Sequence, residues 1–318
     1  MEAAELVPLG RTGLRVSRLG LGLASLGGLF TPVSDADAAA TIDRAWQLGV
    51  RFFDTAPVYG YGRSETRAGR ALRSRTGYVL ATKVGRLIEP GGADTQPIWA
   101  DPPPGVGPRL DYRRAAVRRS LDESRARLGL PRVDVAHVHD PDLDLTTALA
   151  DAYPELVSLR DQGVVGAVSI GVNHADVAAD FVRAAPALDC VLIAGRYTLL
   201  DQSALADLLP LCAARGVAVL AAGVFQGGAL TAAPDDVPPA LRARVDALRA
   251  VCAGHGVSPL AAAIQFPFGH PAVTSVVVGA RSPREVEESA TLLRHPLPPA
   301  LWTDLKDADL LPATAPTP

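Results

Sequence analysis

Short apolar runs alternate with longer segments of helical periodicity along the whole chain. The apolar runs are rich in Val, Leu, Ile and Ala and lie at 20–23, 50–54, 78–83, 133–139, 166–170, 189–193, 217–221 and 274–278. Helical patterns follow near 34–48, 64–73, 113–128, 145–161, 175–184, 202–214, 239–254 and 284–293, with a further short helix at 258–266. This alternation indicates repeated βα units around a parallel sheet. Eight strands are the number that a closed barrel requires, so we predict an α/β fold, a (β/α)8 TIM barrel.

The two ends of the chain depart from this alternation. Two short extended runs around a Gly-containing turn predict an N-terminal β-hairpin over 6–19, placed to cover the N-terminal end of the barrel. No shift in composition marks a second domain, so residues 1–318 are expected to form a single barrel domain. The tail 311–318 is rich in Pro, Ala and Thr, and we expect it to be flexible.

Composition and charge then narrow the class of protein. Apolar residues make up 48% of the chain and charged residues 20%, which suits a large core. The net charge of -3 and the absence of a basic stripe argue against nucleic-acid binding. No run reaches the roughly 18 apolar residues of a membrane span, and no secretory signal pattern opens the chain. Cys190, Cys212 and Cys252 are widely spaced, as is typical of buried thiols in a reducing compartment. We expect a cytoplasmic monomer or small homo-oligomer whose partner is a small molecule.

Two connections are longer than a barrel needs. Residues 85–111 separate the third strand from its helix, are rich in Pro and Gly, and carry Trp99. Long loops in compact domains are usually functional or disordered, and we favour a substrate-covering loop over a dispensable insertion. Residues 223–239 follow the seventh strand. Their three glycines allow backbone N–H groups to face an anion.

Polar side chains stand at the ends of three successive strands. Asp54, Lys83 and His139 close the second, third and fourth strands, and Tyr59 follows Asp54 by five residues. The carboxyl ends of barrel strands converge on one face. A polar group at the mouth of an apolar core must be hydrogen-bonded or hydrated, so these four side chains predict one reaction centre.

The residue types indicate the chemistry of this centre. The Lys83 ammonium is expected to lower the pKa of the Tyr59 phenol from its ordinary value of about 10, and Asp54 to pair with Lys83. His139 can orient a substrate carbonyl or hydroxyl. Such a site suits the interconversion of an alcohol and a carbonyl, with electrons from a cofactor. His137 is expected to be a packed or hydrogen-bonded core residue, and no metal site is predicted.

The cofactor phosphates require a second region. No GxGxxG follows a strand and no GxxxxGK[ST] occurs, so the Rossmann and P-loop interpretations fail. The glycines of 223–228, and the stretch 276–286 that runs from the eighth strand into a helix start with Arg281, are the alternative anion sites.

Five motifs carry a family resemblance. They are LGRTGLRVSRLGLG (9–22), FFDTAPVYGYGRSE (52–65), ATKVG (81–85), RVDVAHVHD (132–140) and VVVGARSPREVEES (276–289). Through them the chain resembles the aldo-keto reductases over nearly its whole length. The resemblance implies a tetrad of Asp54, Tyr59, Lys83 and His139, with Tyr59 as general acid/base. It also implies direct hydride transfer to or from the nicotinamide of NADP or NAD.

Further site residues are expected around this tetrad. The candidate cofactor contacts are Gly22, Leu23, Asn173, Tyr197, Gly223, Val224, Phe225, Gly227, Gly228, Gly279, Arg281, Arg284, Glu285 and Ser289. The candidate substrate contacts are Trp99, His139 and Arg196.

Some positions depart from the common family pattern. Where many members have Gly-Val-Ser-Asn-Phe, this chain has Ser-Ile-Gly-Val-Asn at 169–173, so Asn173 is expected to replace the usual carboxamide contacts, and Ala194 stands for the usual Gln. Glu285 lies near the position where many NADP-binding members carry Arg or Gln. With Arg281 and Arg284 close by, the choice between NAD and NADP stays open.

The segments 169–176, 192–202 and 221–230 resemble the branch that contains D-threo-aldose, L-fucose and L-galactose dehydrogenases and pyridoxal 4-dehydrogenase. This branch typically oxidises a cyclic hemiacetal to a lactone. The expected reaction is therefore oxidation of an aldose, of the L-fucose or D-threo-aldose type, at C1. The alternatives are a reductase of small aldehydes or ketones, a pyridoxal 4-dehydrogenase, and a cofactor-binding regulatory subunit similar to the potassium-channel β-subunits.

Overall fold

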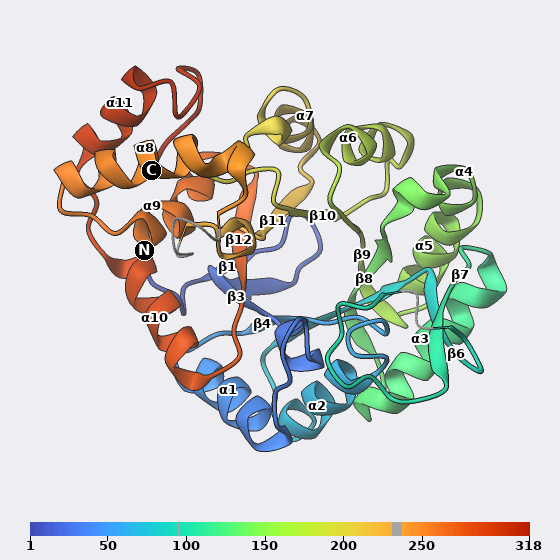
Figure 1. The fold of residues 1–318 in the computed structure, drawn as a ribbon. Helices are drawn as coiled ribbons and strands as arrows, with labels where there is room; N and C mark the ends of the chain where they lie inside the picture. Colours follow the sequence, from blue (N-terminus) through green and yellow to red (C-terminus); the bar gives the residue numbers. More distant parts are fainter. Residues whose placement is uncertain (94–95, 231–236) are drawn as a thin grey trace.

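The computed structural model describes residues 1–93, 96–230 and 237–318. Eight parallel strands form a closed barrel surrounded by helices (Figure 1), as the alternating pattern predicts. In order around the barrel they are β3 (Leu19–Gly22), β4 (Phe52–Asp54), β5 (Val79–Val84), β8 (Val133–His139), β9 (Val165–Val172), β10 (Cys190–Ala194), β11 (Ala218–Ala222) and β12 (Val273–Gly279). Pairing of β12 with β3, with Val276 opposite Leu19, closes the ring.

The helices of the outer layer follow the expected spacing with three exceptions. Their bounds are α1 (Asp35–Gln47), α2 (Arg63–Leu72), α3 (Arg114–Leu128), α6 (Ala175–Ala184), α7 (Leu208–Arg215), α8 (Pro239–Gly254), α9 (Pro259–Gln265), α10 (Pro283–Arg294) and α11 (Pro299–Asp307). The first exception is the helix predicted over 202–214, which is found as a 3-10 turn (Ser203–Leu205) and a helix that begins only at Leu208. Helix α11 was not expected. The helix predicted over 145–161 is divided into α4 (Leu145–Thr147), a π-helical segment (Ala148–Ala152) and α5 (Tyr153–Asp161). Pro154 causes the division, because it has no N–H to donate to the preceding turn.

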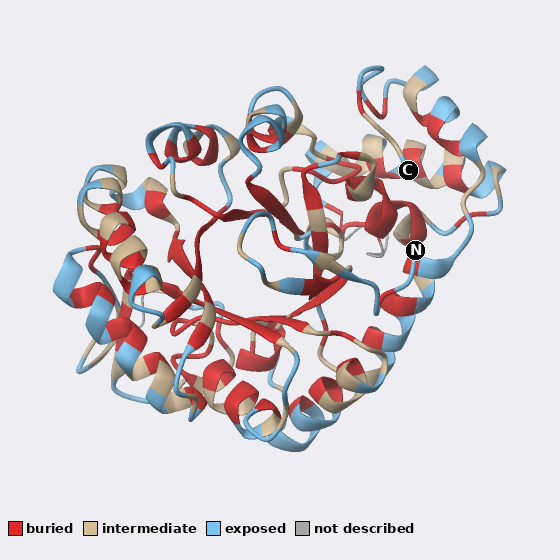
Figure 2. Cartoon of the chain, turned by 180° about the vertical axis from the view of Figure 1, so that it is seen from behind, coloured by how far each residue is buried: buried red, intermediate tan, exposed pale blue. Residues whose placement is uncertain are grey.

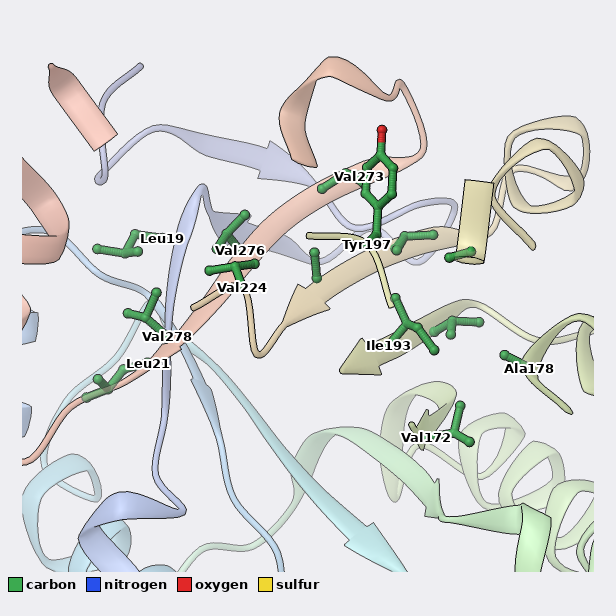
Figure 3. Packing of buried hydrophobic residues seen from close by; sticks show 14 of the residues in the cluster. Leu19, Leu21, Val172, Ala178, Ile193, Tyr197, Val224, Val273, Val276 and Val278 are labelled. Atoms are coloured by element: carbon green, nitrogen blue, oxygen red, sulfur yellow. The ribbon is translucent and has the colours of Figure 1, made fainter. Parts of the chain in front are cut away.

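Strand alternation divides the core into two layers. Phe52 points into the barrel and packs with residues such as Val79, Leu192 and Leu220, whereas its neighbour Phe53 faces the helices. Buried positions accordingly occupy the strands and the inner faces of the helices, and exposed positions lie outside (Figure 2). Figure 3 shows part of the outer layer.

Both ends of the chain pack against the barrel. The predicted hairpin is present as β1 (Leu6–Pro8) and β2 (Arg15–Ser17), and it places Leu9 and Val16 in the barrel interior. The flexible tail expected over 311–318 stays a prediction, although the apolar side chains of Leu311 and Ala315 are only 2% and 1% exposed. Burial of these side chains holds the tail on the molecule.

The loop over 85–111 contains its own secondary structure. Strands β6 (Arg86–Pro90) and β7 (Val106–Leu110) pair antiparallel and leave the barrel directly after β5. We call the described part of this segment, 85–93 and 96–111, the lid. This hairpin was not predicted, because the many Pro and Gly residues of the segment are typical of a loop without strands.

The longest apolar helices belong to the core of the barrel domain. In the part of the chain that the structure describes, no single helix is long and apolar enough to cross a membrane. Helix α8 and the segment Pro259–Gly269 reach that length and hydropathy only when taken together, and the two are bent by 99° relative to each other. Both members of that pair contribute buried side chains to the core, including Val245, Leu248 and Ile264. Within the same described ranges, no group of three or more His, Cys, Asp or Glu side chains has an arrangement that would hold a metal ion.

The contact between α2 and α3 gives a stability test. A Cβ on Gly69 would lie 2.1 Å from the carbonyl oxygen of Leu128, so the Gly69→Ala variant must push the two helices apart. We expect it to lower the free energy of unfolding by about 1–3 kcal/mol, measured by urea denaturation followed by circular dichroism. Gly254→Ala is the matched control, because a Cβ there meets nothing within 4 Å. Equal losses in the two variants would contradict a specific clash between α2 and α3.

Candidate active site

A buried ion pair lies at the carboxyl ends of β4 and β5. The Lys83 ammonium donates to both carboxylate oxygens of Asp54, at 2.7 and 2.6 Å, and to the carbonyl oxygen of Thr55 at 2.9 Å. The two residues are only 2% and 4% exposed. All three donor hydrogens of the ammonium therefore have protein acceptors, which a buried charge requires. The pairing predicted from the sequence is confirmed.

His137 lies beneath this pair on β8. Its Nδ1 is 2.7 Å from the Ser169 hydroxyl, and its Nε2 is 3.3 Å from Asp54 Oδ1. Burial lowers the pKa of His137, which favours the neutral imidazole. Burial alone would raise the pKa of Asp54, but the Lys83 charge and the nearby His137 imidazole hold it below its usual value. His137 is thus the hydrogen-bonded core residue that the sequence predicted.

Tyr59 and His139 face the ion pair from the barrel mouth. The Tyr59 ring centroid is 4.9 Å from Lys83 Nζ and 6.0 Å from the centroid of the His139 ring, and the two rings are nearly perpendicular. Burial raises the pKa of Tyr59, and the nearby Lys83 charge opposes this shift without overcoming it. The expected lowering of that pKa is therefore wrong for the cofactor-free protein. Desolvation of the phenolate outweighs its attraction to an ammonium already neutralised by Asp54.

The backbone around His139 is held by the lid and the start of the following helix. The Tyr112 hydroxyl lies 2.5 Å from the carbonyl oxygens of both His139 and Asp140. Asp140 adopts a left-handed conformation (φ 45°), and its carboxylate accepts from Arg86 at 2.7 Å. Burial holds the pKa of His139 well below its usual value, so its imidazole is neutral at pH 7. A neutral ring can donate from one nitrogen and accept at the other.

These side chains open into a cavity of about 220 Å³. It is lined by Ala24, Leu29, Val58, Tyr59, Lys83, Gln96, Ile98, Trp99, His139, Asp140, Gly171, Val172, Asn173, Leu192 and Ala194. The Trp99 ring lies 5.6 Å from the Tyr59 ring, tilted by 41°. The lid thus forms one wall of the cavity, which is the placement expected for a substrate-covering loop. We call this space the reaction cavity.

A second cavity, of about 500 Å³, lies beside the first, and Leu29 lines both. Its lining residues are Ser25, Leu29, Phe30, Gly223, Val224, Phe225, Gly227, Gly228, Leu260, Val277, Val278, Gly279, Arg281, Glu285, Glu288, Ser289 and Leu292. We call it the glycine-lined cavity. Within the described ranges, the buried Nε of Arg281 has no hydrogen-bond partner. An unpartnered guanidinium nitrogen beside glycine backbone suits the phosphates of a dinucleotide.

Most predicted cofactor residues line one of these cavities. The glycine-lined cavity contains Gly223, Val224, Phe225, Gly227, Gly228, Gly279, Arg281, Glu285 and Ser289, and the reaction cavity contains Asn173 and the substrate candidates Trp99 and His139. Part of the long 223–239 connection, residues 231–236, lies outside the described residues.

Five of the predicted cofactor and substrate contacts line neither cavity. Gly22 and Leu23 precede the lining residue Ala24, and Leu23 is fully buried. Tyr197 is 1% exposed and lies among buried residues of the core (Figure 3). Its ring centroid is 4.9 Å from that of Phe266. Arg284 points outward and pairs with Glu288 at 2.7 Å.

Arg196, the fifth of them, acts on the reaction cavity only indirectly. Its Nε donates to the Asn173 carbonyl oxygen at 2.6 Å, and its Nη1 pairs with Asp201 at 2.9 Å. It therefore positions the backbone of a lining residue.

Several lining residues were missed at the sequence level. Asp140 directly follows the strand-end histidine, and this position was a usable signal. Gln96 lies in the predicted substrate-covering loop and Glu288 lies on the same helix as the predicted Glu285, so both positions also carried a signal. Leu29 and Phe30 gave none, because they reach the cavities from a short loop after β3.

Comparison with known proteins identifies the family. The aldo/keto reductase family model matches residues 18–309, which is most of the chain. The chain belongs to the aldo/keto reductase family. It is 39% identical to a D-threo-aldose 1-dehydrogenase from Pseudomonas sp. (94% of this chain, 96% of the relative) and 38% identical to a pyridoxal 4-dehydrogenase from Microbacterium luteolum (98% and 99%). A solved glycerol dehydrogenase from Gluconobacter oxydans superposes with a TM-score of 0.76 at 25% identity, covering 99% of this chain and 98% of that one.

Membership of the aldo/keto reductase family makes the protein an oxidoreductase that uses a nicotinamide cofactor, NAD or NADP. The expectation of an enzyme of this family is confirmed. Members of the family bind small carbonyl or sugar substrates together with the nicotinamide cofactor.

The raised pKa of Tyr59 can be measured directly. In the cofactor-free protein we expect the Tyr59 phenolate to form only above the ordinary phenol pKa of about 10, because burial disfavours the charged form. The measurement is the tyrosinate absorbance of the wild type minus that of Tyr59→Phe during a pH titration. A difference signal already complete at pH 8 would mean that the Lys83 charge outweighs burial and that the pKa of Tyr59 is lowered.

Proposed function

We propose that the protein oxidises an aldose in its cyclic form at C1 to the lactone, with Tyr59 as the general base and NAD as the hydride acceptor. The observation that carries this proposal is the buried Lys83–Asp54 pair beside Tyr59 and His139. Lys83, Tyr59 and His139 line a cavity that adjoins a glycine-lined one. This combines a proton-transfer group, a substrate space and a dinucleotide space in one connected region.

The reaction balances with one proton and one hydride. The C1 hydroxyl loses its proton to the Tyr59 oxygen, the C1–H bond breaks with both electrons, and the C1–O bond becomes double. The nicotinamide, when bound, accepts the hydride. In the reverse direction the Tyr59 hydroxyl protonates the carbonyl oxygen. Because burial raises the pKa of Tyr59, oxidation gains rate as the pH rises toward that pKa, whereas reduction loses rate once the pH exceeds it.

The other polar groups assist this proton transfer. Lys83 provides positive charge beside the phenol oxygen, and Asp54 keeps the ammonium charged despite its burial. Neutral His139 can donate a hydrogen bond to the substrate oxygen without competing for its proton.

The walls of the reaction cavity favour a polyhydroxylated substrate. Asp140, Gln96 and Asn173 place polar groups on the lining, and the Trp99 ring offers a flat apolar surface for the C–H face of a sugar ring. A relative named D-threo-aldose 1-dehydrogenase supports the same substrate class. The aromatic wall formed by Tyr59 and Trp99 also suits a flat pyridine ring, so pyridoxal is the second candidate.

The glycine-lined cavity favours NAD over NADP. Glu285 and Glu288 both line it, while Arg284 turns outward and is paired with Glu288. Glu285 is oriented by the backbone N–H of Arg281, which donates to its Oε2 at 2.8 Å. A carboxylate can accept from a ribose 2′-hydroxyl but repels a 2′-phosphate.

The reaction is tested by turnover of the purified protein. L-Fucose, D-arabinose, L-galactose, pyridoxal and simple aldehydes are offered with each cofactor, and the absorbance of the reduced nicotinamide is followed. We expect oxidation of at least one aldose, and a loss of at least ~10²-fold in kcat for Tyr59→Phe with nearly unchanged cofactor affinity.

Each other outcome points to a different function. Turnover of pyridoxal or of simple aldehydes without any sugar would reject the aldose proposal. Tight cofactor binding without turnover in either direction would favour the regulatory-subunit alternative. Wild-type turnover in Tyr59→Phe would remove Tyr59 from the proposed role.

Cofactor choice has a separate test on α10. We expect the wild type to have a higher kcat/KM for NAD than for NADP, and Glu285→Gln to reduce that ratio about tenfold, since a hydrogen bond to a charged group is lost and a repulsion removed. Glu287→Gln is the matched control, because Glu287 pairs with Arg44 at 2.6 Å and does not line the cavity. An unchanged ratio in Glu285→Gln, or an equal change in the control, would refute this assignment.

A further inference from the structure

A short backbone bridge joins the loop after β3 to the lid beside the two cavities. Leu29 pairs with Trp99 as an isolated antiparallel β-bridge. On either side, the Phe30 N–H donates to the Ile98 carbonyl oxygen at 2.7 Å and the Ala100 N–H to that of Gly28 at 2.8 Å. Residues 28–30 and 98–100, which we call the strap, thus join the loop after β3 to the lid.

The strap lies between the two cavities. Leu29 lines both cavities, Phe30 lines the glycine-lined cavity, and Ile98 lines the reaction cavity. A dinucleotide with its nicotinamide beside Tyr59 and its phosphates on the glycine backbone must therefore pass Leu29. The strap is in position to hold the middle of that molecule.

The conformation of Phe30 costs folding free energy for two independent reasons. The residue is 66% exposed, although a large aromatic side chain gains free energy from burial. Its backbone is also left-handed (φ 63°), a conformation that disfavours bulky residues and that glycine adopts without penalty. Both costs occur at a residue that lines the glycine-lined cavity. Strain of this kind clusters at ligand clamps, where a ligand offsets it.

The strap is tied to the surrounding site on each side. A Cβ on Gly27 would lie 2.8 Å from the carbonyl carbon and oxygen of Tyr59, so the chain entering the strap packs directly on the loop of the proposed general base. Arg281 Nη2 donates to the Leu29 carbonyl oxygen at 3.3 Å. On the lid side, Arg63 Nη1 donates to the Ala100 carbonyl oxygen at 3.0 Å.

We propose that the strap closes over the bound dinucleotide, with the Phe30 ring as its cover, and that the cofactor leaves only after the bridge to the lid opens. This inference rests on the proposed use of the two cavities by NAD. It assigns Phe30 to cofactor retention and makes the lid a determinant of cofactor release as well as a wall of the substrate space.

The first test is the rate of cofactor release from Phe30→Ala. Release of reduced cofactor is followed by stopped-flow fluorescence, and hydride transfer by single-turnover absorbance. We expect release about tenfold faster than in the wild type, with a hydride-transfer rate that changes much less. Leu110→Ala is the matched control, because Leu110 is a 41% exposed apolar residue of the lid and lines neither cavity.

The second test breaks the bridge without altering a side chain in either cavity. Ala100→Pro removes the N–H that donates to Gly28, whereas Ala100→Gly keeps it. We expect faster release in Ala100→Pro than in Ala100→Gly, and cofactor binding by both variants reports that the barrel is folded.

The outcomes separate the strap from the proposed function. A wild type that binds neither NAD nor NADP would reject the proposed function itself. A wild type that binds cofactor, with release from Phe30→Ala no faster than from Leu110→Ala, would overturn the strap alone. Faster release from Phe30→Ala with no difference between the two Ala100 variants would overturn the link to the lid.

Discussion

The active site depends on one interaction, the ion pair between Lys83 and Asp54 inside an apolar barrel. Removing two charges from water costs several kcal/mol per ion, and their attraction offsets this cost only when every remaining polar atom is also satisfied. The Thr55 carbonyl oxygen and the His137 imidazole complete that arrangement. Because these partners come from β4 and β8, on either side of β5, the pair fixes the mutual register of three adjacent strands.

The dry environment that the pair requires also determines the state of Tyr59. The same burial that strengthens the Lys83–Asp54 attraction disfavours a phenolate nearby. The neutral phenol is therefore the resting form, and the site is poised to donate a proton unless further positive charge or a higher pH favours the phenolate. The protonation state of the proton-transfer group is thus an electrostatic property of the whole site. It is not a property of the tyrosine alone.

The parts of the structure that were predictable are those with a local signal. Strand and helix periodicity located the eight barrel strands, and the polar strand ends located the tetrad, because both patterns are carried by nearby residues. The wrong predictions concern positions where a single proline or burial in the folded chain outweighed the local sequence pattern. Pro154 divided a helix with continuous apolar periodicity, and desolvation reversed the expected shift of the Tyr59 pKa. Tyr197 follows a barrel strand, as a site residue would, but its side chain packs in the core against Phe266.

Leu29 and Phe30 were missed because their place in the site depends on a contact between distant segments. Leu29 and Phe30 belong to a loop after β3, and only pairing with the lid, some 70 positions later in the sequence, places them over the cavities. If that segment needed only a left-handed turn, glycine would provide it at lower cost, as Gly28 already does with φ 97°. A phenylalanine there adds an exposed ring and backbone strain without a compensating contact in the core. The energetic balance is restored only if the ring gains a contact when the site is filled, which connects the strap to the cofactor.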